Sequence, residues 1–277
     1  MPLNLLGGLH YLVLAERAAW GDVPAALVDE ASFLRGFLAE QGVQTNEVRR
    51  SWVLLPLFLR VAERTGAERF DLVELGPSAG LNLLWDRYAY RYEAGDWGRD
   101  DATLVLSGEE RGTVPGRLLS LVPVVDRRVG IDLSPVDVTT DDGARLLVSF
   151  VWADQHERVE RLRRAIEVLR RDPPELLRGD LVELLPGVLE RRRDEALTVV
   201  FQTAVFAYLP DSDRARLREV LGAAGAAGPL AFVSTGRPRG DAETWGLRIT
   251  HWPGGEREFA GHADYHGAWL DWELGGP

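Results

Sequence analysis

A glycine-rich turn after a strand-like run contains the first residues that could bind a ligand. Residues 70–75 precede Gly76-x-Ser78-x-Gly80, and Glu74 lies two positions before the first glycine. Glycines let a backbone turn sharply and approach a ligand closely, and the amino end of a following helix attracts a carboxylate. An acid in this place is typical of S-adenosylmethionine sites. There Glu74 would hold the ligand's amino group and the loop its carboxylate.

Two further carboxylates end two later strand-like runs. Asp132 ends a strand near 128–132, where it can accept both ribose hydroxyls of an adenosyl group. Asp180 ends a strand over 175–180 and is placed to accept the adenine amino group. Each could instead cap the helix that follows. Together with Glu74 they are expected to meet at one edge of the sheet, and the neighbouring Asn82, Leu133 and Leu181 complete the predicted cofactor set.

A fourth strand, over 198–202, ends in Gln202 and Thr203, which are the candidate catalytic residues on the acceptor side. Their side chains could orient a methyl acceptor by hydrogen bonding, or could simply satisfy backbone groups at the strand end. This segment contains no acid and no histidine. Methyl transfer from a sulfonium can proceed by positioning alone, so a missing base does not exclude the reaction.

The elements that must position these residues alternate between strands and helices. Residues 1–66 are predicted to form a helical cap, and residues 67–277 a domain with an insertion at about 89–121. The helices that separate the strands are predicted at 140–151, 154–171, 181–193 and 211–223, with a fifth strand at 230–234 and a closing antiparallel hairpin of 247–252 and 269–272. This order predicts an α/β fold with a mostly parallel, Rossmann-like sheet of the class I methyltransferase type.

The third predicted helix begins at Thr45 or Asn46 and ends near Thr65. Asn46, Glu47 and Arg50 share one face of it at helical spacing. They could close the cofactor site, or could be a helix cap followed by solvated charges.

Composition excludes several kinds of chemistry. The chain has no cysteine, and all 32 basic residues are arginine, so thiolate metal sites, cysteine nucleophiles and catalytic lysines are absent. A net charge of −11 argues against nucleic acid as a partner. No uninterrupted run of 18 apolar residues occurs, so the expectation is a soluble cytoplasmic protein with a small-molecule substrate. His262 and His266 lack a third ligand, so no metal is expected.

The same turn permits a second chemistry, because Gly76-x-Ser78-x-Gly80 also matches the nucleophile elbow of serine hydrolases. The triad would then draw on later residues, namely His251, His262 or His266 with Asp211 or Asp213. An elbow strand normally follows several other strands, whereas residues 1–66 look helical. A degenerate member that binds a nucleotide-like ligand without turnover is a third alternative. A nicotinamide site fits less well, because Ser78 replaces the middle glycine.

Several stretches together resemble the bacterial domain of unknown function 2332 family. They are residues 44–50, 74–83, 86–88, 130–138, 152–155, 178–180 and 203–210. Members of this family are similar to class I S-adenosylmethionine-dependent methyltransferases, so the resemblance implies that fold and S-adenosylmethionine as cofactor. Because the family pattern usually starts further upstream, the resemblance also implies a segment ahead of Pro2.

Overall fold

The computed structural model describes residues 2–42, 44, 46–236 and 244–275. The chain divides into two compact units. The first contains Met1–Asn46 and Val136–Pro173, and the second contains Glu47–Pro135 and Pro174–Pro277. All the residues predicted to bind the cofactor or the acceptor belong to the second unit.

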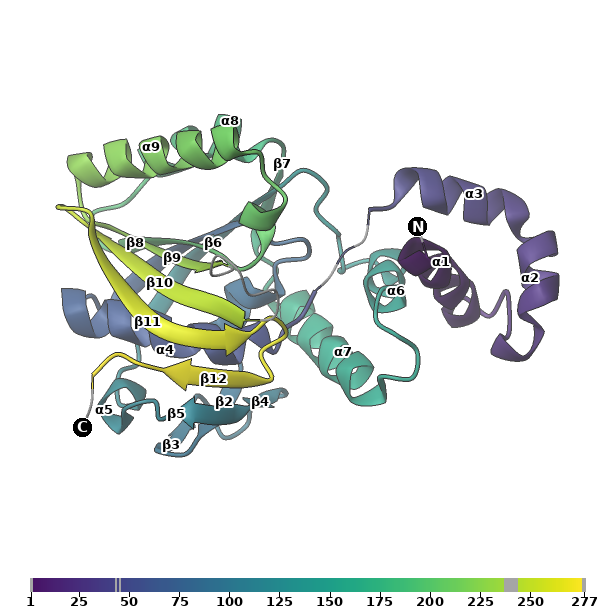
Figure 1. Ribbon diagram of the computed structural model, residues 1–277, viewed down its shortest axis with the longest axis horizontal. Helices are drawn as coiled ribbons and strands as arrows, with labels where there is room; N and C mark the ends of the chain where they lie inside the picture. Colours follow the sequence, from purple (N-terminus) through teal and green to yellow (C-terminus); the bar gives the residue numbers. More distant parts are fainter. Residues whose placement is uncertain (1, 43, 45, 237–243, 276–277) are drawn as a thin grey trace. The chain divides into compact units, whose positions relative to one another are not determined.

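A nine-stranded sheet organises the second unit (Figure 1), in the order β5-β12-β11-β10-β9-β8-β1-β6-β7. Five neighbouring strands are parallel: β7 (Glu175–Arg178), β6 (Val124–Asp132), β1 (Arg69–Leu75), β8 (Leu197–Gln202) and β9 (Leu230–Gly236). The next two, β10 (Thr244–Trp252) and β11 (Glu256–Asp264), are antiparallel to both of their neighbours, and β12 (Trp269–Trp272) is antiparallel to β11. The fold is therefore a mixed α/β structure with a large, mostly parallel sheet.

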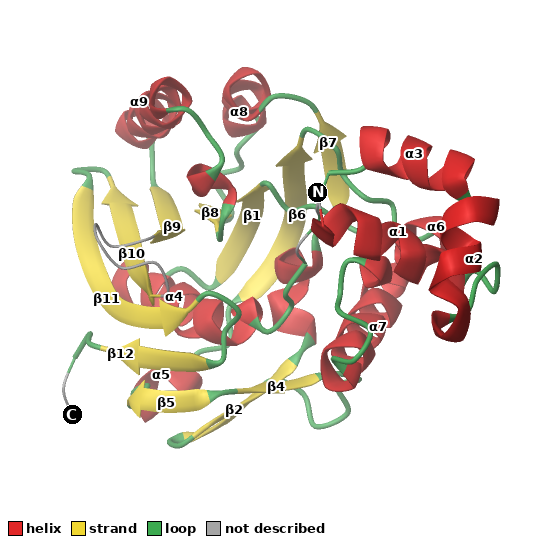
Figure 2. Ribbon diagram, turned by 45° about the vertical axis from the view of Figure 1, so that its right-hand side comes forward, coloured by secondary structure: helices red, strands yellow, loops and turns green. Residues whose placement is uncertain are grey.

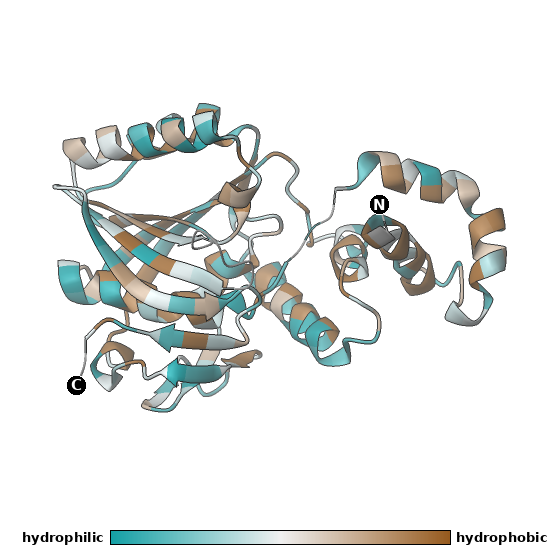
Figure 3. Cartoon of the chain, in the orientation of Figure 1, coloured by the Kyte–Doolittle hydropathy of each residue, from teal (hydrophilic) through white to brown (hydrophobic). Residues whose placement is uncertain are grey.

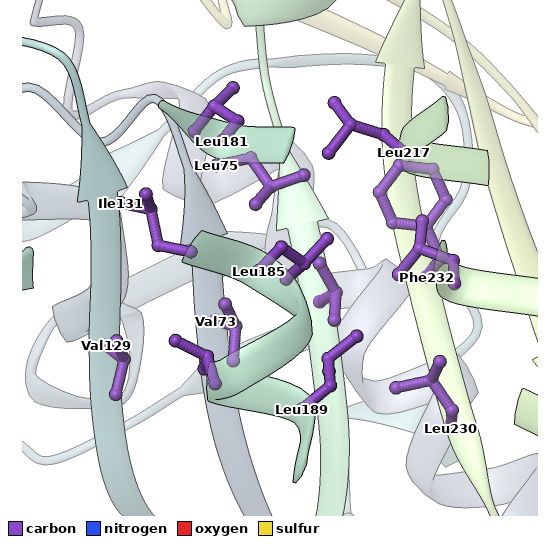
Figure 4. Packing of buried hydrophobic residues seen from close by; sticks show 13 residues of the cluster. Val73, Leu75, Val129, Ile131, Leu181, Leu185, Leu189, Leu217, Leu230 and Phe232 are labelled. Carbon is purple, nitrogen blue, oxygen red and sulfur yellow. The ribbon is translucent and has the colours of Figure 1, made fainter. Parts of the chain in front are cut away.

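Helices cover both faces of the parallel strands (Figure 2). The helices α8 (Leu181–Glu190) and α9 (Asp211–Ala227) lie on one face, and α4 (Arg50–Thr65) on the other. The 3₁₀ helix η2 (Leu81–Arg87) packs against α4. Burial from two sides explains why the central strands read as continuous apolar runs. In β1 every residue after Arg69 is buried. Side chains of these strands pack with α8 and α9 in one cluster, with Leu185 fully buried within it (Figure 4).

The pairing of the last strands differs from the prediction, and the helix after Gly80 is of an irregular kind. Residues 247–252 were expected to pair with residues 269–272, but β10 pairs instead with the unpredicted β11, and β12 pairs with β11 on its other side. The segment after Gly80 was expected to open a helix, and it forms the short 3₁₀ helix η2, in which Leu84 departs from helical angles. The Asn82 amide accepts a hydrogen bond from the Ser51 hydroxyl at 2.8 Å. A short polar side chain bonded elsewhere does not favour a regular helix.

The segment expected as an insertion contains a separate three-stranded sheet. Its strands are β2 (Ala89–Tyr92), β3 (Gly95–Trp97) and β4 (Val105–Ser107), and they are followed by β5 (Glu109–Gly112) and α5 (Gly116–Leu119). β5 pairs in parallel with β12 and so forms the edge strand of the large sheet.

The first unit is helical. It contains α1 (Pro2–Leu14), η1 (Trp20–Asp22), α2 (Val23–Asp29), α3 (Ala31–Glu40), α6 (Asp141–Ser149) and α7 (His156–Arg171). α1 contacts both α3 and α6 and is largely hydrophobic along its length (Figure 3). The predicted division into a cap of residues 1–66 and a domain of residues 67–277 is not decided by these contacts, but they do group α4 with the sheet. Within the described ranges, no helix is long and apolar enough to cross a membrane.

Candidate functional site

The three predicted carboxylates lie at one edge of the sheet, where three neighbouring parallel strands end. Glu74 is near the carboxyl end of β1 and is level with Gly130 of β6. Asp132 is the last residue of β6, and Asp180 follows β7 by two residues. Because β1, β6 and β7 are parallel neighbours, their carboxyl ends necessarily share an edge, which is where open α/β sheets bind ligands.

The turn after β1 requires glycine at two positions. Gly76 has a φ of +70° and Gly80 a φ of +82°. A Cβ atom on Gly76 would lie 2.6 Å from Cβ of Val205, and one on Gly80 would lie 2.9 Å from Cγ of Pro174. Ser78 also has a positive φ, of 53°, a conformation that costs energy for a residue with a side chain. The turn is therefore fixed both by its own conformation and by what packs against it.

Asp132 links this turn to the loop that follows β6. One carboxylate oxygen, Oδ2, accepts a hydrogen bond from the Ser78 backbone N–H at 2.9 Å, and Oδ1 accepts one from the Ser134 N–H at 2.8 Å. A carboxylate has about four lone-pair sites, so both oxygens can accept further hydrogen bonds. Leu133, beside it, is 67% exposed. An apolar side chain so exposed next to the carboxylate is available to pack against a planar ring.

Asp180 caps a helix. Its Oδ1 accepts hydrogen bonds from the Val182 N–H at 2.7 Å and from the Glu183 N–H at 3.2 Å, at the start of α8. Asp180 therefore acts as a helix cap, which was one of the two expected roles, and its contact with adenine stays a prediction. Leu181, the first residue of α8, is buried among the apolar side chains of the sheet.

Glu74 is a deeply buried acid at this edge of the sheet. Its side chain is 1% exposed, and Oε2 is buried without a hydrogen-bond partner. Burial raises the pKa of Glu74 to about 8, and the negative charge of Asp132 adds to the effect. The charge of Arg50 and a hydrogen bond from Asn82 act in the opposite direction. Without a ligand, Glu74 is therefore mostly protonated at pH 7, and a nearby cation would favour its ionised form.

Arg50 at the start of α4 is the buried cation of this neighbourhood. Its side chain is not solvated, contrary to the alternative of a solvated helix face, because the residue is only 5% exposed. Its guanidinium lies over the rings of Trp245 and Tyr265, with Cζ 5.0 and 4.5 Å from their centroids, and Nε donates to the Tyr265 carbonyl at 3.0 Å. Nη2 is buried without a hydrogen-bond partner. Nothing in the sequence indicated Trp245 and Tyr265, which lie about 200 positions away.

Gln202 holds the loop that follows β8. Its Nε2 donates to the Thr235 carbonyl at 2.5 Å, and its Oε1 accepts from the Phe206 N–H at 3.4 Å. The Thr203 carbonyl accepts a hydrogen bond from the Thr235 hydroxyl. Both residues are buried. Gln202 thus satisfies backbone groups at the strand end, and a contact with an acceptor stays a prediction for both residues.

The hydrolase alternative finds no support in the geometry. His251 lies on β10, with Nε2 3.7 Å from Oε2 of Glu258, and His262 on β11 is paired with Glu273 at 3.0 Å. β10 and β11 are separated from β1 by at least two strands.

Within the residues that the structure describes, no group of three or more His, Asp or Glu could hold a metal ion.

A cavity of about 890 Å³ lies at the opposite end of the sheet from Glu74. It is lined by Thr65–Arg69 and Glu195–Thr198, at the amino ends of β1 and β8, together with the end of α9. Because it is remote from the three carboxylates, it has no part in the site described here.

Known proteins were compared with this chain by sequence and by structure. A methyltransferase of Clostridium acetobutylicum that depends on S-adenosylmethionine has a TM-score of 0.29 at 10% identity, covering 80% of this chain and 73% of its own. The glycopeptide N-methyltransferase MtfA, in complex with S-adenosylhomocysteine, has a TM-score of 0.25 at 16% identity, covering 84% and 71%. Neither TM-score is high enough to establish a shared fold. No curated protein matches. The model of a family described as an uncharacterized protein conserved in bacteria, DUF2332, matches residues 1–272, and the chain belongs to that family.

Proposed function

We propose that this protein binds S-adenosylmethionine at the carboxyl edge of β1 and β6 and transfers its methyl group to a small molecule. The observation that carries the proposal is a pair of buried, unsatisfied groups of opposite kind, Oε2 of Glu74 and Nη2 of Arg50. The order of the parallel strands, β7-β6-β1-β8-β9, supports the predicted Rossmann-like sheet of the methyltransferase type. In this reading the antiparallel strands β10 and β11 take the place of the closing hairpin.

The two unsatisfied groups are complementary to the amino-acid end of the cofactor. An α-ammonium would satisfy Glu74, and an α-carboxylate would satisfy Nη2 of Arg50. Arg50 replaces the expected binding of the carboxylate by a helix end, because η2 is too short and irregular to provide one. The Ser51 hydroxyl and the Asn82 amide connect the start of α4 to Glu74, so both ends of the zwitterion would be held by one connected set of side chains.

The adenosyl end fits the remaining residues. Asp132 retains acceptor capacity for the ribose hydroxyls, and the backbone of Gly76, Ser78 and Gly80 lies close to it through the Ser78 N–H. Leu133 offers an exposed apolar side chain for the adenine ring. Asp180, which caps α8, would approach the adenine amino group with the oxygen that does not cap.

The sulfonium of the bound cofactor supplies an electrophilic methyl group. The protein's part is then to hold the acceptor in line with that group and to exclude water, for which no general base is required. Gln202 and Thr203 are the candidate residues for contact with the acceptor. Gln202 would act as a positioning residue, because its amide already fixes the loop from Thr203 to Phe206.

Isothermal titration calorimetry with two ligands tests the cofactor assignment. S-adenosylhomocysteine contains the amino-acid end, and 5′-methylthioadenosine lacks it. Arg50→Gln should lower the affinity for S-adenosylhomocysteine by about tenfold or more, because a charge-assisted hydrogen bond is lost. It should leave the affinity for 5′-methylthioadenosine unchanged. Asp132→Ala should lower the affinity for both ligands by about tenfold or more.

The neighbouring arginine provides a matched control. Arg49 donates to the Ser107 carbonyl at 2.9 Å, so Arg49→Gln removes the same charge without touching the proposed contacts and should leave both affinities unchanged. If the unaltered protein binds neither ligand, the site assignment is wrong. Methyl transfer is tested separately, by release of S-adenosylhomocysteine in the presence of candidate acceptors; binding without release would favour the degenerate alternative.

A further inference from the structure

The helical first unit contains a cavity of its own, of about 460 Å³. It lies between the first helix and the segment that joins α6 to α7, and its lining includes Leu6, His10, Trp20, Phe150 and Trp152. Cavities that hold small ligands occupy about 300–1,000 Å³ and are mostly apolar, with a few polar groups placed to fix orientation. This cavity has that size and composition.

Trp20, Phe150 and Trp152 contribute large aromatic rings to its walls. Trp20 and Trp152 are 44% and 47% exposed, so parts of both rings are accessible to a ligand. Phe150 forms a buried part of the wall, and its ring comes so near α1 that a Cβ atom on Gly7 would lie 3.1 Å from it. The glycine at this position thus lets the ring approach the helix. A flat aromatic ligand would find ring faces on more than one side.

Two buried polar residues line the cavity, His10 and Ser149. The Ser149 hydroxyl donates to the Leu146 carbonyl at 2.7 Å, and His10 can fix the orientation of a ligand. His10 is 7% exposed, and its Nδ1 lies 3.0 Å from the Val151 carbonyl oxygen. A carbonyl can only accept, so Nδ1 is the protonated nitrogen, and in the neutral ring Nε2 is then an acceptor. Burial lowers the pKa of His10, which keeps the ring neutral at pH 7. The Trp20 ring packs against the imidazole at 5.7 Å.

We infer that this cavity binds a small, flat aromatic molecule that donates one hydrogen bond, through N–H or O–H, to Nε2 of His10. The aromatic side chains provide apolar contact area, and the acceptor nitrogen of His10 favours ligands with a donor. No residue of the proposed S-adenosylmethionine site lines this cavity, so the inference does not depend on the proposed function.

Two ligands that differ by one donor test this inference on the full-length chain. Indole has an N–H group, and 1-methylindole has the same rings without it. Calorimetric titration at pH 7.5 should give indole an affinity about tenfold higher, the usual worth of one hydrogen bond to a buried group. If neither compound binds at millimolar concentration, or if both bind equally, the inference is wrong.

Variants then locate the contact. His10→Asn keeps a donor for the Val151 carbonyl and removes the acceptor. It should therefore lower the affinity for indole to that for 1-methylindole and leave the affinity for 1-methylindole unchanged. Trp152→Ala should lower the affinity for both ligands. Phe259→Ala removes an exposed aromatic residue of the second unit and should change neither affinity. A preference for indole that survives in His10→Asn would overturn the assignment, and the comparison of the two ligands in the unaltered protein remains decisive if that variant does not fold.

Discussion

The protonation state of Glu74 gives the sharpest test of the proposed cofactor site. Burial holds the pKa of Glu74 near 8 in the free protein. An ammonium group of a ligand beside it would favour the ionised form and lower that pKa. Binding of S-adenosylhomocysteine must then release a proton wherever the free protein holds one, so affinity must rise with pH until Glu74 is ionised before binding.

The magnitude follows from the pKa. With a value of about 8, roughly one molecule in 300 has Glu74 ionised at pH 5.5 and roughly one in four at pH 7.5. The affinity for S-adenosylhomocysteine should therefore rise by about 75-fold over these two pH units, provided the bound-state pKa lies below the range. Titrations in buffers of different ionisation enthalpy should show release of about one proton per ligand near pH 6.

Two variants separate this effect from other titrating groups. Glu74→Gln removes the titration and should make the affinity nearly independent of pH. Asp71→Asn alters another buried acid of β1, one that pairs with Arg193 near the opposite end of the strand, and should preserve the pH dependence. An affinity that stays flat from pH 5.5 to 7.5 in the unaltered protein, or binding without proton release, would refute the contact between Glu74 and the ligand's ammonium group.

The same pKa predicts a change in stability without any ligand. A carboxyl group whose pKa rises from 4.5 to about 8 on folding keeps its proton in the folded state while the unfolded state loses it. The free energy of unfolding therefore falls as pH rises through this range, by as much as about 4 kcal/mol. Glu74→Gln should lack that fall, so the variant gains stability over the unaltered protein between pH 5 and pH 8. Urea unfolding at several pH values measures it, and equal slopes in both proteins would contradict the raised pKa.

Three further substitutions test the structure around the site. Gly76→Ala places a Cβ atom 2.6 Å from Val205 in a left-handed conformation and should lower stability by about 1–3 kcal/mol, together with loss of S-adenosylhomocysteine binding in calorimetry. Asp180→Ala removes the cap of α8 and should cost about 1 kcal/mol in urea unfolding; a cost near zero would show that the cap is not formed. Leu185→Ala opens a cavity in the cluster beneath α8 and should cost about 2–5 kcal/mol, with affinity for the ligand unchanged in the folded protein.

The parallel half of the sheet was accessible from the sequence because its strands are buried on both faces. Such strands are short apolar runs between helices of clear periodicity, and β1, β8 and β9 lie within one or two residues of the predicted bounds. β11 was missed for the opposite reason. Its residues 256–264 begin with three charged residues and bury only part of their length, so their pattern resembles a loop, and only pairing with β10 makes them a strand.

The candidate site was predictable in position and less so in detail. Residues at the ends of parallel strands must share an edge, so Glu74 and Asp132 could be brought together from their order alone. What each carboxylate binds depends on local geometry that the sequence does not contain. Asp180 caps α8, and Asp132 joins two loops through the Ser78 and Ser134 N–H groups. Both roles leave carboxylate oxygens able to accept further hydrogen bonds, so the structural role of these acids and the proposed binding role can coexist.

The arrangement of Arg50 and Glu74 is difficult to explain by stability alone. An unsatisfied buried polar group costs about 1–3 kcal/mol, and more if it is charged. A direct ion pair would satisfy both groups, yet no nitrogen of Arg50 lies within ion-pair distance of Glu74, although its charge lowers the pKa of that acid. The guanidinium is held instead by two aromatic rings and the Tyr265 carbonyl. A cation fixed apart from a protonated acid, one that would ionise beside a ligand's ammonium group, is suited to a zwitterion placed between them, and both unsatisfied groups would then gain partners when that ligand binds.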